Sequence, residues 1–244
     1  MRREIPNGAP KRTIGVLGGM GPEATILLMQ KVLRAVPAHD DADHIPLITH
    51  QNPCVPSRLA ALLDGPEKQT APDPGPVLAQ MACDLQAAGA KALAMPCNTA
   101  HHFAPMIKAA CPLPLLDMRE LSAQALSAKG AVRVGLLASP AVRLTGVFDA
   151  AFAAHDLQAV FPDNDDMILS VIRAIKSGQP GDPATLATQA RRLMERGCDH
   201  ILVACTELSL LAGDLPADIP WSDSLDCLTR AIVAFSTGQA APDE

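Results

Sequence analysis

Two cysteines, Cys97 and Cys205, stand in matching sequence surroundings. Each follows a short apolar stretch, and each is followed at once by a small polar residue, Asn98 or Thr206. A thiolate can act as a base, and a neutral thiol can donate a proton. Removing the α-hydrogen of an amino acid and replacing it from the opposite face needs one base and one acid on opposite sides. A pair of thiols can supply both without a cofactor, whereas two buried structural cysteines would be the plain alternative.

An internal repeat places the two cysteines at corresponding positions. Residues 14–17 match residues 134–137, and residues 89–99 match residues 197–206. In both halves a helix is expected to stop at a glycine, a buried strand follows, and the cysteine comes at its end. Ligands of open parallel sheets bind beyond the carboxyl ends of the strands. We therefore expect the two cysteines to line one cleft from opposite sides.

Short apolar stretches alternate with longer amphipathic ones, a pattern typical of a parallel sheet covered by helices. The expected strands are residues 13–17, 47–50, 91–95, 115–117, 133–137 and 200–204. The expected helices are one that begins at Pro22 and continues through Leu33, one that follows Thr99, and residues 76–88, 144–154, 166–177 and 182–196. Residues 64–76, rich in Gly, Pro and Asp, are expected to form a loop.

Composition excludes several classes of function. The net charge is −6, aromatic residues make up 2% of the 244 residues, and Lys and Arg form no block, which argues against nucleic-acid binding. No apolar run is long enough to span a bilayer, and the basic start has no apolar segment behind it, so neither a membrane protein nor a secretion signal is expected.

The cysteine pattern and the histidines argue against metal. The seven cysteines include no pair at C-x-x-C spacing, which favours neither a disulfide framework nor a thiolate zinc site. Reduced thiols fit a cytoplasmic protein. The neighbours His101 and His102 point in different directions on a helix and cannot chelate one ion together. We expect no metal.

Three further features lie near the expected cleft. The loop at residues 19–24 fits a loose dinucleotide fingerprint, but Pro22 removes an N–H group and Glu23 adds negative charge, so a carboxylate at this helix start is favoured over a nucleotide. Arg58 is expected at the same sheet edge, where a guanidinium can grip a carboxylate. Lys176 stands near a helix end, where a surface cation would also be favourable.

Three motifs resemble the aspartate/glutamate racemase superfamily, and most closely its aspartate racemase branch. They are the segments 14–25 (IGVLGGMGPEAT), 95–101 (MPCNTAH) and 204–208 (ACTEL), and the resemblance covers most of the chain. The Cys-Thr-Glu form of the last motif points to aspartate racemases, since the glutamate racemase branch has His after the threonine.

The resemblance implies an α/β fold of two similar domains, each a flavodoxin-like parallel sheet flanked by helices, with the active site in the cleft between them. The expected division is residues 1–118 plus 216–244 for one domain and 119–215 for the other. It also implies racemisation without pyridoxal phosphate by catalytic Cys97 and Cys205, a small acidic amino acid as substrate, and a homodimer. The substrate-binding residues implied are Met20, Arg58, Asn98, Thr99, Lys176, Thr206 and Glu207.

One departure from the family pattern concerns the substrate. Where relatives read I-P-D-R-T, this chain reads Val-Pro-Ser-Arg-Leu at residues 55–59, so a charge and a hydroxyl beside Arg58 are missing. Aspartate is the expected substrate, with glutamate or a broader set of amino acids as the alternative. Two other hypotheses remain: a cysteine isomerase or decarboxylase acting on a small dicarboxylate, and a non-catalytic amino-acid or nucleotide sensor.

Overall fold

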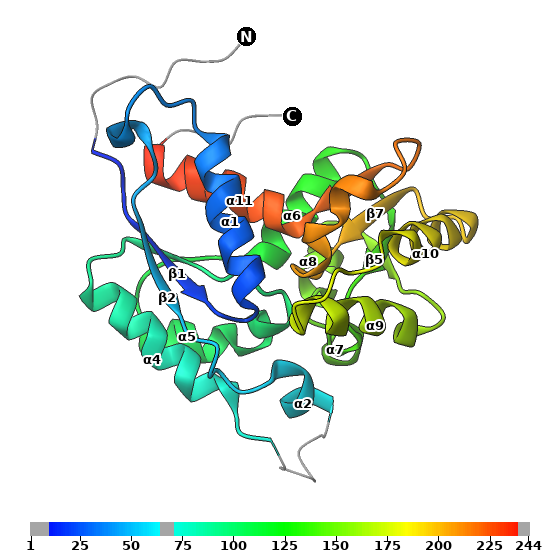
Figure 1. Cartoon of the computed structure of the whole chain (residues 1–244), viewed down its shortest axis with the longest axis horizontal. Helices are drawn as coiled ribbons and strands as arrows, with labels where there is room; N and C mark the ends of the chain where they lie inside the picture. The colour runs from blue at the N-terminus through cyan, green and yellow to red at the C-terminus, as the bar shows by residue number, and fades with distance from the viewer. Residues whose placement is uncertain (1–9, 64–70, 239–244) are drawn as a thin grey trace.

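Two parallel sheets with the same strand order form the framework of the computed structural model, which describes residues 10–63 and 71–238 (Figure 1). The first has the order β2-β1-β3-β4 and the second β6-β5-β7-β8. The strands of the first sheet are β1 (Ile14–Gly18), β2 (Leu47–Gln51), β3 (Ala92–Ala94) and β4 (Leu115–Leu116). Those of the second are β5 (Arg133–Leu137), β6 (Gln158–Val160), β7 (His200–Val203) and β8 (Trp221–Asp223).

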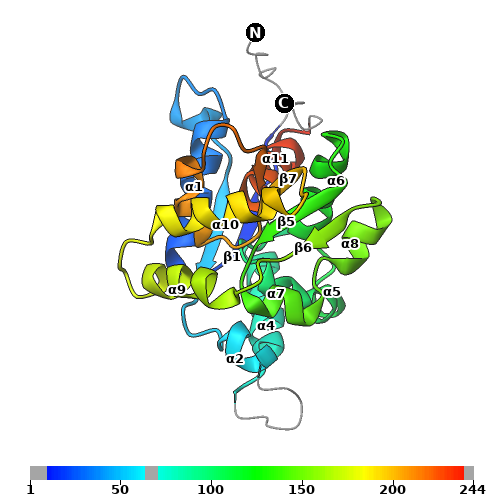
Figure 2. The same ribbon diagram turned by 90° about the vertical axis from the view of Figure 1, so that its right-hand side faces the viewer.

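Helices cover both faces of each sheet, because the central strands β1, β3 and β7 are buried throughout and, apart from His200 at the start of β7, apolar. One face of the first sheet packs against α4 (Pro74–Ala87) and α5 (Ala104–Ala110), and the other against α1 (Pro22–Ala35) and α11 (Ser224–Thr237). On one face of the second sheet lie α9 (Asp165–Lys176) and α10 (Pro183–Glu195). Figure 2 shows α8 (Asp149–Ala154) on its other side.

The remaining elements are α6 (Met118–Ala128) and several short helices. The short ones are α2 (Arg58–Leu63), α7 (Pro140–Thr145) and the 3₁₀ helices η1 (Asp41–Asp43), η2 (Thr99–Phe103), η3 (Leu208–Leu210) and η4 (Ala212–Asp214). No helix in the described ranges is both long and apolar enough to cross a lipid bilayer.

The last helix of each half covers the sheet of the other half. From α6, which follows β4, Ala123 and Leu126 pack with residues of β5 and β7. From α11, which follows β8, Leu225, Leu228 and Ile232 pack with residues of β1 and β3. The two helices contact each other between the sheets (Figure 1). Each half therefore contributes a helix to the hydrophobic core of the other half.

The α/β fold of two similar parallel sheets is confirmed, and all six expected strands are present. The single helix expected at 144–154 is wrong: it is two helices, α7 and α8, separated at Gly146, which adopts the left-handed conformation with φ +56°. Strands β6 and β8 and helix α11 were not predicted. Part of the expected loop, residues 64–70, lies outside the described residues.

Strand pairing bears on the expected division of the chain. β8 pairs with β7, Ile201 opposite Trp221, and so residues 221–223 belong to the second sheet. The chain returns to the first sheet only with α11. If sheet membership defines the domains, the boundary expected at 215/216 moves to 223/224. The division into 1–118 plus 216–244 and 119–215 otherwise stays a prediction.

Candidate active site

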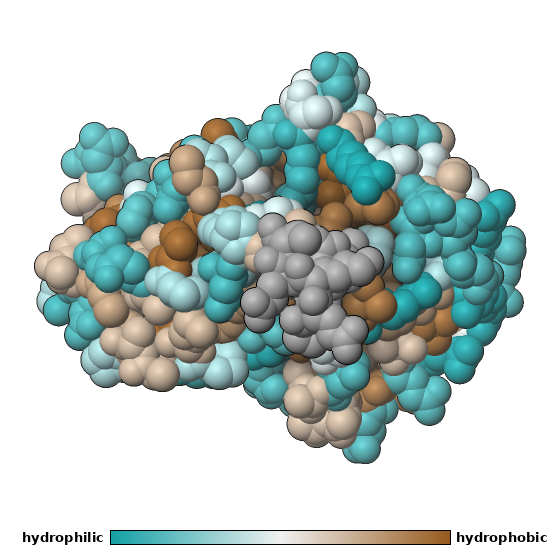
Figure 3. Space-filling model, turned by 90° about the horizontal axis from the view of Figure 1, so that it is seen from below, coloured by the Kyte–Doolittle hydropathy of each residue, from teal (hydrophilic) through white to brown (hydrophobic). Residues whose placement is uncertain are grey.

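A cavity of about 110 Å³ lies between the carboxyl ends of the two sheets. All the residues named from sequence as catalytic or substrate-binding line it: Met20, Arg58, Cys97, Asn98, Thr99, Lys176, Cys205, Thr206 and Glu207. They come from the ends of β1, β3 and β7 and from α2 and α9, which the repeat brings to one place. Seen from below in Figure 3, apolar surface lies recessed among hydrophilic side chains.

Cys97 lies in a tight turn directly after β3, 8% exposed. Its N–H donates to Met95 O over 2.8 Å, and its carbonyl oxygen lies 2.9 Å from His101 Nδ1. The N–H of Met118, in the first turn of α6, donates to His101 Nε2 over 3.2 Å. Because Nε2 accepts, Nδ1 carries the hydrogen and donates to the cysteine carbonyl.

His101 is fully buried, and burial lowers its pKa. The ring is therefore neutral at physiological pH, as its two hydrogen bonds require. This histidine was considered from sequence only as a metal ligand. In the structure, its hydrogen bond to the Cys97 carbonyl holds the turn that contains Cys97. Among the described residues, no group of three His, Cys, Asp or Glu side chains could hold a metal ion.

Cys205 occupies the corresponding position after β7, also 8% exposed, but its neighbours are charged. Its thiol donates to Glu207 Oε2 over 3.1 Å, and Glu207 Oε1 lies 3.2 Å from Lys176 Nζ. Burial and the negative charge of Glu207 raise the pKa of Cys205 well above its ordinary value. The neutral thiol is therefore the resting form of this cysteine.

Lys176 reaches this cluster from the end of α9. Burial alone would lower the pKa of Lys176, but the attraction of Glu207 and of both cysteines raises it above the ordinary value. Lys176 therefore stays a cation and offsets negative charge that forms on Glu207 or on a thiol. The Glu207 carboxylate contacts the thiol of Cys205 and the ammonium group of Lys176, and its expected part in substrate binding stays a prediction.

Polar contacts across the cavity tie the two halves together. The Thr206 hydroxyl donates to Pro96 O over 3.0 Å, so the residue after one cysteine holds the residue before the other. The hydroxyl oxygens of Thr99 and Ser139 lie 3.2 Å apart. Because each bond joins one half to the other, the two cysteine turns are fixed relative to each other.

Arg58, the first residue of α2, is 9% exposed and points its guanidinium at the chain before it. Nη1 donates to Val55 O over 3.1 Å and to Pro56 O over 2.9 Å. Its buried Nε has no hydrogen-bond partner among the described residues. The side chain is thus held in place with a donor unused, as a carboxylate ligand would require.

The loop after β1 brings Met20 to the cavity. Gly19 has φ +93°, and a Cβ there would lie 2.4 Å from the backbone of Asn52, so only glycine fits. The Gly19 N–H donates to Thr25 Oγ1 over 2.9 Å, which closes the loop onto α1. The peptide between Met20 and Gly21 is cis.

The sequence analysis did not name several residues that line the cavity. Leu169, Ile172 and Arg173 lie with Lys176 on one face of α9, and Ser139 follows β5. The α9 residues recur at helical spacing counted back from Lys176, which could have indicated them. Ser139 occupies the place in the second half that Met20 and its neighbours occupy in the first, so the repeat could have indicated it.

Two thiols, from equivalent strands of two sheets, face one small cavity that is also lined by three cationic side chains. A thiolate in this cavity can take a proton from carbon, and the neutral thiol of Cys205 can give one. Arg58, Lys176 and Arg173 can bind carboxylates and stabilise the negative charge that develops during proton removal.

Comparisons with known proteins agree with this arrangement. The Asp/Glu/Hydantoin racemase family matches residues 17–232. The broad specificity amino-acid racemase RacX of Bacillus subtilis (strain 168) is 26% identical over 229 residues, covering 91% of this chain and 96% of that protein.

Two solved structures have a similar fold. Picrophilus torridus aspartate racemase has a TM-score of 0.80 at 25% identity, over 95% of this chain and 96% of that one. An aspartate racemase homologue from Pyrococcus horikoshii OT3 has a TM-score of 0.71 at 19% identity, over 93% and 99%. The resemblance to the superfamily and to its aspartate racemase branch is confirmed. The chain belongs to the Asp/Glu/Hydantoin racemase family, and it is an isomerase of the amino-acid racemase class.

Proposed function

We propose that the protein racemises aspartate by moving a proton between the two faces of the α-carbon with Cys97 and Cys205. The observation that carries this is the convergence of both thiols, from equivalent strands, on one cavity with cationic side chains. In one direction the Cys97 thiolate removes the α-proton and the Cys205 thiol donates one from the opposite face. In the other direction the roles are exchanged.

Charge balance in this scheme falls to Glu207 and Lys176. When Cys205 has given its proton to the carbanion it is a thiolate beside the carboxylate of Glu207. Two neighbouring negative charges in a buried site are costly unless a cation is paired with them. Lys176, 3.2 Å from Glu207, supplies that cation. Arg58 and Arg173 are left for the substrate's carboxylates.

A broader substrate range is the second candidate, and the walls of the cavity favour it. Leu59, Leu169 and Ile172 line the cavity, and Lys176 is already paired with Glu207. Ser57 and Leu59 flank Arg58, so the segment adds no further charge there. The similarity to a broad specificity racemase from Bacillus subtilis supports the same candidate.

Proton exchange in heavy water, without pyridoxal phosphate, tests both candidates. We expect deuterium to enter the α-carbon of L- and D-aspartate and each enantiomer to be converted into the other. Racemisation of aspartate at least tenfold faster than that of glutamate and of neutral amino acids would support the first candidate, and comparable rates would support the second.

The remaining alternatives give other results in the same assay. A cysteine isomerase or decarboxylase would leave the α-carbon of aspartate unlabelled and convert a small dicarboxylate instead. A sensor would be thermally stabilised by an amino acid or nucleotide with neither exchange nor turnover. Either result would overturn the racemase proposal.

The setting of the protein is also a proposal. All seven cysteines are free thiols, which supports a reducing compartment such as the cytoplasm. The family resemblance supports a homodimer. Light scattering of the purified protein should give twice the 25.5 kDa of one chain.

A further inference from the structure

The junction between β8 and α11, Asp223 and Ser224, contacts both cysteine-bearing turns. The side chain of Asn98, the residue after Cys97, donates from Nδ2 to Ser224 Oγ over 2.8 Å. The Ser224 hydroxyl in turn donates to Val203 O over 3.0 Å, two residues before Cys205. One hydroxyl therefore links the chain beside the first cysteine to the strand that carries the second.

These two bonds also fix the orientation of the Asn98 amide. Because Val203 O can only accept, the Ser224 hydroxyl hydrogen is used there, and its oxygen accepts from Asn98. The amide must then direct Nδ2 at Ser224. Its Oδ1, buried and without a partner among the described residues, is turned elsewhere, and Asn98 lines the cavity.

Asp223 holds the second turn. Its Oδ1 accepts from the Ser209 hydroxyl and from the N–H of Leu225, both over 2.8 Å. The N–H of Ser209 donates to the carbonyl of Cys205 over 3.3 Å, so Ser209 closes the turn that contains the thiol. Asp223 is thus connected to Cys205 through one residue.

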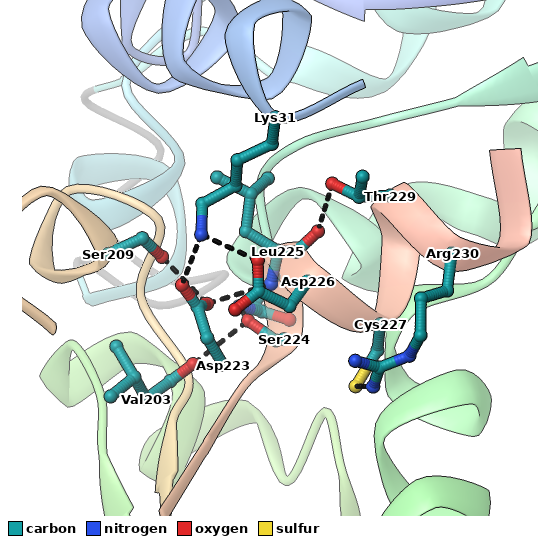
Figure 4. Close-up of polar contacts among 11 residues, drawn as sticks. Lys31, Val203, Ser209, Asp223, Ser224, Leu225, Asp226, Cys227, Thr229 and Arg230 are labelled. Carbon is teal, nitrogen blue, oxygen red and sulfur yellow. Dashed lines mark hydrogen bonds and ion pairs between the residues drawn. The ribbon is translucent and has the colours of Figure 1, made fainter. Parts of the chain in front are cut away.

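The junction is also held by the first half of the chain. Lys31, on α1, lies between the two carboxylates in Figure 4, with Nζ 3.7 Å from Asp223 Oδ2 and 2.5 Å from Asp226 Oδ1. Asp223 and Ser224 are 2% and 0% exposed. Neither lines the cavity, so any effect on the reaction must pass through the turns that they contact.

We propose that Asp223 and Ser224 are positioning residues that set the separation of Cys97 and Cys205 across the substrate. The inference rests on the proposed two-thiol racemisation. Inversion needs both sulfur atoms within reach of one α-carbon, whereas exchange of a proton on one face needs only one of them. Loosening the junction should therefore impair inversion more than same-face exchange.

The test is Ser224→Ala. A second variant, Ser209→Ala, independently removes the hydrogen bond that Ser209 donates to Asp223 on the Cys205 side. Ser236→Ala is the matched control, because Ser236 is buried on the same helix and its hydroxyl has no hydrogen-bond partner among the described residues. In heavy water, we measure deuterium incorporation with retained configuration and inversion of L- and D-aspartate for each variant.

We expect Ser224→Ala and Ser209→Ala to lower kcat for inversion about 10-fold with little change in KM, as a small misplacement of reacting groups does. The ratio of exchange to inversion should rise at least threefold. Ser236→Ala should keep the wild-type kcat and ratio. Asp223→Asn, which retains the oxygen that accepts from Ser209 and Leu225, should keep the ratio near that of the wild type.

Unchanged ratios in both Ser224→Ala and Ser209→Ala would overturn the inference while leaving the racemase proposal intact. If the wild type itself neither exchanges nor inverts aspartate or any other amino acid, the proposed function fails instead. Cooperative thermal unfolding confirms that each variant is folded, and if Ser224→Ala is not, Ser209→Ala decides alone.

Discussion

The turns after β3 and β7 occupy equivalent places in the two halves but are built with different chemistry. Cys97 is supported by the neutral imidazole of His101, which bonds its carbonyl. Cys205 donates its thiol hydrogen to Glu207, which is paired with Lys176. The repeat accounts for two thiols that face one cavity. Their neighbours are not shared by the repeat, and at Cys205 burial and a nearby carboxylate raise the pKa of the thiol well above its ordinary value.

A similar contrast is found one strand further along each sheet. Asp117, directly after β4, and Asp223, the last residue of β8, both cap the following helix. Although burial opposes it, hydrogen bonds from Arg119 hold the pKa of Asp117 at about 2. Burial, with repulsion from Asp226, raises the pKa of Asp223 to about 6. Carboxyl groups at equivalent positions therefore titrate at different pH.

Removing either thiol should have the largest effect on racemisation. Cys97→Ala and Cys205→Ala should each lower racemisation about 10²–10⁴-fold, the usual contribution of a general acid or base. Each variant should retain exchange from one face only, so that the two variants label opposite enantiomers. Chiral chromatography and deuterium incorporation measure both. Cys111→Ala, a buried thiol outside the cavity, is the control and should racemise normally. Near-normal racemisation in either thiol variant would rule out the two-base scheme.

Glu207→Gln should make the Cys205 thiol easier to ionise. Loss of the negative charge should lower the pKa of Cys205, so its alkylation by iodoacetamide should begin at lower pH while that of Cys97 changes less. Peptide mass spectrometry resolves the two sites. We expect kcat/KM to fall about 10-fold, equally for both enantiomers because the equilibrium constant of racemisation is one. Glu195→Gln, an exposed site on α10, is the control. An unaltered alkylation profile at Cys205 would contradict this role of Glu207.

The two aspartates should respond to pH in opposite directions. The folded pKa of Asp223, about 6 against 3.8 in the unfolded chain, means that its contribution to stability is present below pH 4 and lost as pH rises through 6. The loss is about 2–3 kcal/mol. Relative to the wild type, Asp223→Asn should therefore gain stability as pH rises from 4 to 7.

For Asp117 the sign is reversed. Its folded pKa lies below the unfolded value, so it stabilises the fold above pH 4, and that contribution is lost as pH falls toward 2. Asp117→Asn should be destabilised at pH 7 and approach the wild type in acid. Urea unfolding at several pH values checks both variants, and parallel curves for the two would refute the contrast.

Ser139→Ala should have the smallest effect. It removes the partner of the Thr99 hydroxyl across the cavity, and one hydrogen bond of this kind is worth about 1 kcal/mol. We expect KM to rise about threefold with kcat nearly unchanged. Ser170→Ala, on the exposed side of α9, should leave both constants as they are. A tenfold fall in kcat would mean that Ser139 takes part in the chemistry.

The sequence predicted the features that its repeat encodes. The strands at 133–137 and 200–204 and the cysteines after β3 and β7 could be recognised because apolar stretches and motifs recur. Strands β6 and β8 could not, since neither is an apolar run: β6 reads Gln-Ala-Val with two residues exposed, and β8 reads Trp-Ser-Asp. Helix α11 was not named, although an N-cap at Asp223, apolar residues at helical spacing and a glycine at 238 mark it in the sequence; which sheet it covers is not shown by its own sequence.

The residues of the site could be predicted from the sequence, but the contacts between them could not. Cys97, Cys205 and Arg58 could be named from motifs and from strand ends. The bond from the Cys205 thiol to Glu207 depends on the shape of the turn, and the support of Cys97 by His101 depends on where Met118 lies in space. Neither contact can be deduced from the spacing of these residues in the sequence.

Helices α6 and α11 each cover the sheet of the other half, and this has a consequence for how the chain folds. A fragment ending after α6 would leave the face of the first sheet that α11 covers open to water, and a fragment beginning at β5 would lack α6 on the second sheet. Neither fragment could bury its apolar surface alone, so the molecule should melt in one cooperative step. An ancestral protein made of a single half would have needed a second copy of itself to cover the open face of each sheet.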